Sequence, residues 1–319
     1  PMGVMSKIPP AKPEDFYFGG NKMKIIVLSS QQCENKDVNN GDCFIIDNGQ
    51  ELILYDCGCE EYAQYVMEYM KENGYQKVKV VLSHNDDDHF KGIPTLVDNG
   101  KVSEITTVLL LKYVDELINI IDDGRKNRES IKRQITEIYD NIYQLSGNNL
   151  QDAFEHVEIA EGITVSGPEK EYILNAAAKG LDTTESDHID GETITNATSI
   201  HLSVKMLDKK ILLTGDSTFE SVMQEEIKDF KVIQLPHHGK KDTGEAIMEE
   251  LKNTTDEVYI VSDNTGNSNG GSDDLKTKGY DVRNTKDSGI LSLDYNSITR
   301  NRESRGTLSE IYNNKKQCE

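Results

Sequence analysis

The chain has 319 residues, of which 36% are hydrophobic, and its formal net charge is −21. This acidity argues against a general nucleic-acid-binding module or a protein of anionic membrane surfaces, unless basic residues cluster locally. No apolar run reaches the ~20 residues of a membrane-spanning helix, and the start of the chain lacks a secretory signal pattern. The five cysteines form no paired motif, which predicts free thiols and a cytoplasmic location.

The first part of the chain predicts an arm followed by strands and a helix. Residues 1–22 are polar and rich in Pro and Lys, which indicates an N-terminal arm. Apolar runs that indicate strands cover residues 24–28, 43–47 and 51–55. Asn48-Gly49 separates the last two runs and predicts a hairpin. Helical spacing over 60–73 then precedes a buried strand at 77–82.

The segment from about 115 to 155 has a different pattern. Its apolar residues recur at intervals of three and four, which predicts two amphipathic helices around Gly124. The apolar stripe of this helical insertion either packs on the core, or caps the site, or binds a protein partner or a second copy of the chain. Further strands are predicted at 163–165, 199–206, 210–213, 232–235 and 258–261. Residues 300–319 are polar and predict a C-terminal tail.

Side chains that can bind a metal ion follow three of the predicted strands. In chain order they are His84, Asp86, Asp88, His89, Asp216, His237 and His238. Alternate residues of an extended loop point the same way, so His84, Asp86 and Asp88 can converge. Imidazole and carboxylate ligands together suit zinc, manganese or iron. An acidic turn with two chance histidines would explain the first stretch, but not ligand-type residues at three strand ends.

These residues resemble the motifs of a known family. The run from His84 to His89 is similar to the His-x-His-x-Asp-His signature of the metallo-β-lactamase superfamily, with Asp86 in place of the second histidine. With Leu-Leu-Thr-Gly-Asp at 212–216 and Pro-His-His-Gly at 236–239, it resembles the hydrolase domain of ComEC-type DNA-uptake proteins and their stand-alone relatives. Asp56 stands where an aspartate of the family braces the metal-binding loop.

The resemblance implies a four-layer αββα sandwich of the α/β class over residues 23–299, with the helical insertion inside it. It also implies two divalent metal ions, zinc or manganese. His84 and Asp86 would hold one ion, and Asp88 and His89 the other. Asp216 would bridge the two ions, and one of the pair His237 and His238 would complete a shell.

Two residues are candidates for a direct catalytic role. Asp88 could orient the attacking water, and Lys241, which falls where the family has a lysine after His-His-Gly, could neutralise a phosphate oxygen. An ordinary exposed lysine is an equally good interpretation of Lys241. The family's third histidine has no clear match; Asn196 and His201 are candidates, and we favour His201 as a hydrogen-bonded histidine of a strand.

The expected function is metal-dependent hydrolysis of a phosphodiester, in a nucleic acid or a small nucleotide. The alternatives are a hydrolase of a lactone, thioester or other carbonyl substrate, and a non-catalytic effector module on the same fold. Because Asp86 makes the site more anionic, we expect manganese to support activity at least as well as zinc. A nucleic acid would need a local basic strip, for which the candidates are Lys240, Lys241, Arg300, Arg302 and Arg305.

Overall fold

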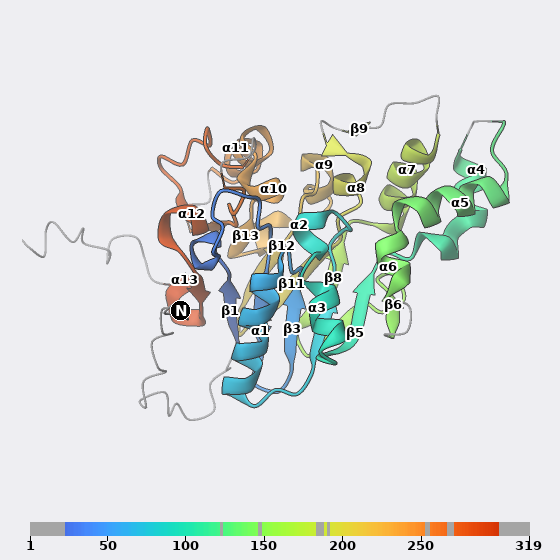
Figure 1. Ribbon diagram of the computed structural model, residues 1–319. Helices are drawn as coiled ribbons and strands as arrows, with labels where there is room; N and C mark the ends of the chain where they lie inside the picture. The colour runs from blue at the N-terminus through green and yellow to red at the C-terminus, as the bar shows by residue number, and fades with distance from the viewer. Residues whose placement is uncertain are drawn as a thin grey trace, which may run out of the picture.

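A computed structural model describes residues 23–121, 124–145, 149–182, 188–189, 192–252, 256–266 and 271–299. The predicted N-terminal arm at 1–22 and the C-terminal tail at 300–319 lie outside these residues, and so do Arg300, Arg302 and Arg305. Within the described ranges, no helix is long and apolar enough to cross a membrane. Figure 1 shows two sheets packed at the centre with helices around them.

The described residues form two large sheets of seven strands each. The order in the first sheet is β16 (Leu291–Leu293), β1 (Lys24–Val27), β2 (Phe44–Asp47), β3 (Leu52–Tyr55), β4 (Val78–Val81), β5 (Val102–Thr107) and β6 (Leu150–Asp152). The order in the second is β15 (Asp281–Asn284), β14 (Val258–Val261), β13 (Val232–Gln234), β12 (Lys209–Leu213), β11 (His201–Met206), β8 (Ile163–Gly167) and β7 (Glu158–Ala160). A short pair contains β9 (His188–Ile189) and β10 (Glu192–Thr193).

Each large sheet is antiparallel on one side and parallel on the other. Strands β3 to β6 of the first sheet pair in parallel, and so do β12 to β15 of the second. Parallel neighbours end at the same edge of a sheet, which is where ligands bind in such folds. The loops that carry Asp56, His84, Asp216 and His237 follow β3, β4, β12 and β13, so each pair of loops shares one edge.

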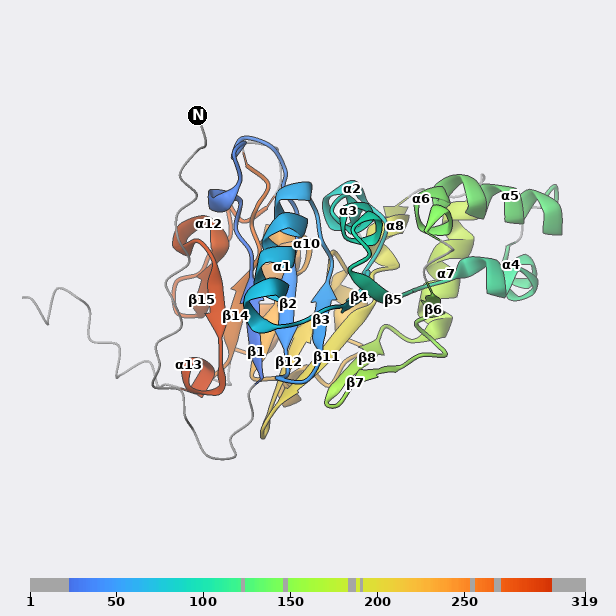
Figure 2. The same cartoon turned by 60° about the horizontal axis from the view of Figure 1, so that its bottom comes forward.

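Alternating side chains of the second sheet separate an inner core from an outer one. Ile211 and Leu213 of β12 join the large core shared with the first sheet. Leu212, between them, joins a second core that includes Ile247 of helix α11 (Lys241–Glu250). Successive side chains of a strand point to opposite faces of its sheet, so a sheet that is covered on both faces contributes alternate residues to two cores. Helices α1 (Glu60–Asn73) and α3 (Ile93–Asp98) lie over the first sheet in Figures 1 and 2, so the expected αββα sandwich is confirmed.

The other described helices range from three residues to the twelve of α7. The α-helices are α2 (Asp87–Phe90), α4 (Val114–Ile120), α5 (Arg128–Ile138), α6 (Asp140–Gln144), α7 (Lys170–Leu181), α8 (Ile194–Ala197), α9 (Phe219–Val222), α10 (Pro236–Gly239), α12 (Thr285–Ser288) and α13 (Tyr295–Thr299). The 3-10 helices are η1 (Ser30–Gln32), η2 (Leu110–Tyr113) and η3 (Ile227–Asp229).

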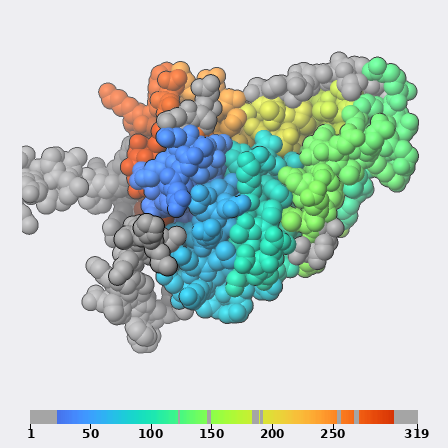
Figure 3. All heavy atoms as spheres, viewed as in Figure 1, coloured from blue at the N-terminus to red at the C-terminus, as the bar shows by residue number. Residues whose placement is uncertain are grey.

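The predicted helical insertion corresponds to α4, α5 and α6, which form a projecting lobe with α7 (Figure 3). Ile131 and Ile135 of α5 are fully buried in the large core, so the apolar stripe packs inward as in the first interpretation. The helices end earlier than predicted, because residues 150–152 are strand β6, which pairs with β5. A three-residue strand has too little periodicity to be recognised, and its partner is distant in sequence.

Polar contacts join the two sheets beside the edge that carries the predicted ligands. The hydroxyl of Tyr55, at the end of β3, donates a 2.8 Å hydrogen bond to the carbonyl of Ile200, just before β11. The N–H of Ile200 donates in turn to the carbonyl of Ser83, 3.1 Å away. Both Tyr55 and Ser83 are buried, so these bonds fix the first sheet against the second where the loops emerge.

Two glycines let other loops approach the backbone of α2. A β-carbon on Gly58 would lie 2.1 Å from the carbonyl oxygen of Asp88, and one on Gly41 would lie 1.6 Å from it. The same carbonyl accepts a 2.9 Å hydrogen bond from the N–H of Asp42. Only glycine, which has no β-carbon, allows another segment of backbone to approach this closely. The carbonyl of Asp88 is therefore fixed from two sides.

The Tyr55 hydrogen bond can be tested against a matched tyrosine. Tyr55→Phe leaves a buried carbonyl without its partner, so we expect the free energy of unfolding to fall by about 1–3 kcal/mol. Tyr62 is equally buried, but its hydroxyl has no hydrogen-bond partner among the described residues. Tyr62→Phe should therefore leave stability unchanged or higher in urea unfolding. Equal losses in the two variants would contradict the role given to Tyr55.

The close approach at Gly58 predicts a second stability difference. Gly58→Ala places a methyl group against backbone that cannot rotate away, so we expect a loss of about 1–3 kcal/mol or more in the free energy of unfolding. Gly124 has nothing within 4 Å of its hypothetical β-carbon, so Gly124→Ala is the control. Thermal unfolding of both variants measures the difference. A Gly58→Ala protein as stable as the control would show that the loops do not constrain each other.

Candidate metal centre

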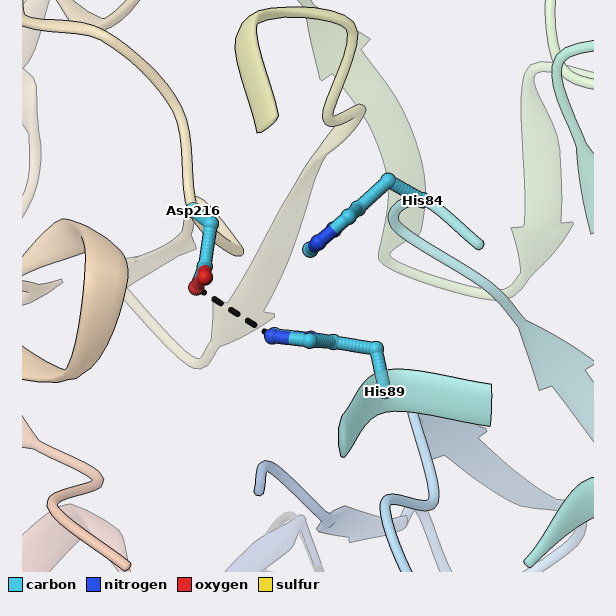
Figure 4. A group of neighbouring side chains, drawn as sticks. All are labelled: His84, His89 and Asp216. Atoms are coloured by element: carbon cyan, nitrogen blue, oxygen red, sulfur yellow. Dashed lines mark ion pairs between the residues drawn. The ribbon is translucent and has the colours of Figure 1, made fainter. Parts of the chain in front are cut away.

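Side chains from two segments of the chain meet at the shared edge of the sheets. His84 follows β4, His89 belongs to α2, and Asp216 follows β12. One ligand-type atom from each lies within 4.8 Å of those of the other two. Figure 4 shows the three side chains pointing toward one another, and His89 Nε2 lies 3.3 Å from Asp216 Oδ1. Residues 84, 89 and 216 are therefore one candidate metal-binding group.

A second group shares His89 with the first. Asp88, His89 and His238 also bring ligand-type atoms within 4.8 Å of one another. His238 Nε2 lies 3.0 Å from Asp88 Oδ2, and Asp216 Oδ2 lies 3.8 Å from Nε2 of both His237 and His238. The carboxylate of Asp216 is thus between the two groups, where a bridging ligand would stand.

Asp86 is the most peripheral of the expected ligands. Its Oδ2 lies 3.8 Å from His84 Nε2, and its side chain is 43% exposed. His84 forms a three-residue group with His89 and Asp216, whereas the expected pairs were His84 with Asp86 and Asp88 with His89. Asp86 therefore stands at the open side of the centre, between the buried ligand-type atoms and solvent.

Each histidine of the centre is held through Nδ1. The contacts are His84 Nδ1 to Ser83 Oγ (2.9 Å) and Ser199 Oγ (3.1 Å), His89 Nδ1 to Asp56 Oδ2 (2.8 Å), His237 Nδ1 to Glu192 Oε2 (2.7 Å) and His238 Nδ1 to Asp42 Oδ1 (3.1 Å). Hydrogen bonds of this kind orient metal-binding imidazoles and fix which nitrogen faces the ion. The expected bracing role of Asp56 agrees with its bonds to His89 and to the N–H and hydroxyl of Ser83.

Three buried atoms at the centre have no hydrogen-bond partner among the described residues. They are His84 Nε2, His89 Nε2 and Asp216 Oδ1. A buried polar atom left without a partner costs about 1–3 kcal/mol, and orphaned atoms of this kind in a folded protein call for an explanation. Divalent cations that take imidazole and carboxylate ligands would give all three a partner, so the residues present fit a metal ion.

Electrostatics at the centre favour positive charge. Burial, assisted by His89, lowers the pKa of His84 to about 3, so His84 is a neutral imidazole, the form that binds metal. Burial also lowers the pKa of His89 and His238, but Asp216 and neighbouring carboxylates outweigh it and hold both pKa values well above their usual range. Burial, assisted by Asp88, raises the pKa of Asp86 to about 6. A bound cation would relieve this surplus of carboxylates.

The backbone is strained where it presents these side chains. Asp56, His237 and His238 have φ angles of 58°, 51° and 55°, in the left-handed region that side chains other than glycine rarely adopt. Such residues cost about 1–3 kcal/mol each and cluster at functional sites. The two histidines differ in exposure, with 30% of the His237 side chain and 3% of the His238 side chain exposed. His238 therefore belongs to the buried centre and His237 faces its opening.

Sequence reasoning missed two carboxylates of the centre. The sequence assigns no role at the centre to Asp42, and Glu192 belongs to no motif. Glu192 is buried and lies 2.7 Å from His237 Nδ1 and 2.6 Å from the ammonium group of Lys240. Part of the proposed basic strip is thus neutralised. Lys241, the first residue of α11, has no hydrogen bond or ion pair to the centre within the described ranges.

Asn196 and His201, the two candidates for the position of the family's third histidine, have different surroundings in the structure. Asn196 is buried on α8, and its Nδ2 lies 3.4 Å from Glu192 Oε2, beside His237. His201 is hydrogen-bonded through both ring nitrogens, to Glu225 and to Ser217. As favoured from the sequence, His201 is a hydrogen-bonded strand histidine, and Asn196 is the one nearer the centre.

The helical lobe reaches the loop that carries the predicted ligands. Asn85, between His84 and Asp86, donates from Nδ2 to the carbonyl of Ile138 at 2.8 Å. Asn141 Nδ2 donates back to the carbonyl of Asn85 at 3.1 Å. The junction of α5 and α6 is therefore fixed to the loop beside Asp86.

Comparison with known proteins places this arrangement in a family. No curated protein matches the sequence. Among solved structures, Igni18, a metallo hydrolase of the archaeon Ignicoccus hospitalis, is 13% identical over 85% of this chain and 99% of that chain, with a TM-score of 0.45. The short form of human tRNase Z is 13% identical over 72% of this chain and 83% of that chain, with a TM-score of 0.33.

A mutant of Bacillus thuringiensis AiiA, with N-decanoyl-L-homoserine bound at its active site, is 11% identical over 75% of this chain and 92% of that chain, with a TM-score of 0.32. All three resemblances are distant. The profile of the metallo-beta-lactamase superfamily, in contrast, matches residues 37–262, which is more than half of the chain and includes every residue of the centre described above. The chain therefore belongs to the metallo-beta-lactamase superfamily.

Proposed function

We propose that the protein is a hydrolase of phosphodiesters that works with two divalent metal ions. Membership of a superfamily of metal-dependent hydrolases supports the general class. The observation that carries the proposal is the set of buried, unpartnered atoms of His84, His89 and Asp216 at the point where two ligand groups meet. The proposed ligands are His84, Asp88, His89, Asp216 and His238, with Asp86 and His237 at the open side.

Bound divalent ions would supply Lewis-acid activation of water and neutralise charge on a phosphate. The chain's own residues would supply the rest. Burial raises the pKa of Asp88, but His89 and the hydrogen bond with His238 outweigh it and hold that pKa below its usual range. Asp88 is therefore an anion at neutral pH, and Asn39 Nδ2 donates a 2.6 Å hydrogen bond to its Oδ2. We assign Asp88 the second role of accepting a hydrogen bond from the attacking water.

Two features favour a phosphodiester of small or single-stranded form. Asp86 adds a carboxylate where the superfamily motif has an imidazole, and oxygen-rich sites suit the harder cations that accompany phosphoryl chemistry. The net charge of −21 would repel the long polyanion of a duplex, and the charge of Lys240 is already balanced by Glu192. Lys241 remains a candidate for contact with a phosphate oxygen.

Hydrolysis of a chromogenic phosphodiester with added Mn²⁺ or Zn²⁺ tests the proposal. We expect metal-dependent turnover that Asp88→Ala lowers by at least about 100-fold, because even partners behind metal ligands contribute about 10–100-fold. Asp87→Ala is the matched control, since Asp87 is an exposed neighbour paired with Lys91. Turnover of a lactone or thioester but of no phosphodiester would show that the substrate class is wrong. An Asp88→Ala enzyme as active as Asp87→Ala would contradict the site.

The carboxylate at position 86 predicts a metal preference. Manganese should support turnover at least as well as zinc in the natural protein, and Asp86→His should shift the ratio of the two rates toward zinc, because imidazole is a softer ligand. The ratio is measured on protein stripped of metal and reloaded with each ion. A ratio that is the same in both proteins would show that Asp86 does not set the preference.

A further inference from the structure

A buried chain of polar side chains lies behind Asp216 and takes no part in the centre itself. His201 of β11 is fully buried, and the side chain of Glu225 is only 10% exposed. His201 Nδ1 lies 3.1 Å from Glu225 Oε1, and His201 Nε2 lies 2.8 Å from Ser217 Oγ. Ser217 directly follows Asp216 in the chain. The relay, by which we mean Glu225, His201 and Ser217, therefore ends one residue from the proposed bridging ligand.

The direction of the hydrogen bonds follows from the donors available. The hydroxyl of Ser217 donates its single hydrogen to the carbonyl of Thr214, so Ser217 joins His201 Nε2 to the backbone of the turn. An ionised Glu225 can only accept from Nδ1, and His201 holds the pKa of Glu225 below its usual range against the opposing effect of burial. His201 therefore links the carboxylate of Glu225 to the hydroxyl of Ser217 through its two ring nitrogens.

The fold makes room for this relay. Ser166 Oγ donates a 2.8 Å hydrogen bond to Glu225 Oε1. A β-carbon on the next residue, Gly167, would lie 2.5 Å from Glu225 Oε1 and 3.1 Å from His201 Nδ1. Glycine at that position lets the carboxylate and the imidazole approach the backbone of β8. Strand β8, strand β11 and the turn after β12 are joined by these contacts.

The turn that the relay holds decides where Asp216 points. It runs from Thr214 to Ser217 and contains Gly215 at a φ of 56°. Oδ1 of Asp216 has no hydrogen-bond partner in the part of the chain that the structure describes, and its ion-pair contact is with His89 Nε2 at 3.3 Å. The N–H of Asp216 donates only a long 3.3 Å bond to Ser199 Oγ. Beyond its contacts with the imidazoles of the centre, the direction of the carboxylate depends on the backbone of the turn.

We propose that His201 is a positioning residue, which through Ser217 fixes the turn of Asp216 and so holds the proposed bridging carboxylate between the two metal-binding groups. The proposal rests on the metal centre described above. It assigns a function to a buried histidine that is not itself a ligand. Loss of the relay should weaken binding of the metal pair more than it weakens the fold.

Two serines provide a matched test. Ser217 and Ser221 are both fully buried, and both lie within hydrogen-bond distance of His201 Nε2, at 2.8 Å and 3.1 Å. Only Ser217 belongs to the turn and bonds to Thr214, because Ser221 is on α9. We expect Ser217→Ala to weaken Mn²⁺ binding by roughly tenfold, the lower end of the range for partners behind metal ligands. Ser221→Ala should change it by less than about threefold.

The readouts are Mn²⁺ titration of the full chain by calorimetry, electron paramagnetic resonance of the bound Mn²⁺ pair, and the melting temperature without metal. Ser217→Ala should lose the spin-coupled signal of a metal pair while its metal-free melting temperature stays close to that of Ser221→Ala. His201→Gln should resemble Ser217→Ala; if it does not fold, the serine pair alone decides.

Equal affinities in the two serine variants would overturn the role of His201 while leaving the metal centre intact. Absence of Mn²⁺ binding and of Zn²⁺ binding by the natural protein would instead overturn the centre, and the relay proposal with it.

Discussion

A buried carboxylate needs positive charge beside it, because desolvating an unpaired anion costs several kcal/mol. Asp42, Asp56 and Asp216 are all buried at one edge of the two sheets, and the imidazoles of His89 and His238 lie among them. These two imidazoles do not supply enough positive charge for three buried carboxylates. This concentration of anionic side chains constrains the rest of the architecture, since each loop must be held against their mutual repulsion, which a bound cation would relieve.

The fold meets that constraint with rigid supports around the centre. Parallel strands deliver the loops to a common edge, and the Tyr55 hydrogen bond fixes one sheet to the other beside it. Gly58 admits the backbone of Asp88 at a distance that a side chain would forbid. The left-handed conformations of His237 and His238 direct successive imidazoles toward Asp216. Strain of this kind persists because the surrounding structure over-determines it, and it is typical of sites organised before their ligand arrives.

Much of this centre could be predicted from the sequence, because its ligand-type residues follow short buried strands and the ends of parallel strands meet. His84, Asp88, His89, Asp216 and His238 fall together as that reasoning expects. Asp42 and Glu192 could not be assigned, because their partners His238 and His237 lie 196 and 45 residues away and no local pattern encodes such contacts. For the same reason the short strand β6 was taken as part of the helical insertion. The balance of charge on Lys240 likewise depends on Glu192, 48 residues away.

The metal centre is tested most directly by locating metal ions in crystals grown with Mn²⁺, by anomalous scattering at the manganese edge. We expect two peaks, both among the side chains of His84, Asp88, His89, Asp216 and His238, with Asp216 contacting both. Peaks elsewhere on the acidic surface, or no peak among these residues, would contradict the claim that the buried, unpartnered atoms of the centre are metal ligands.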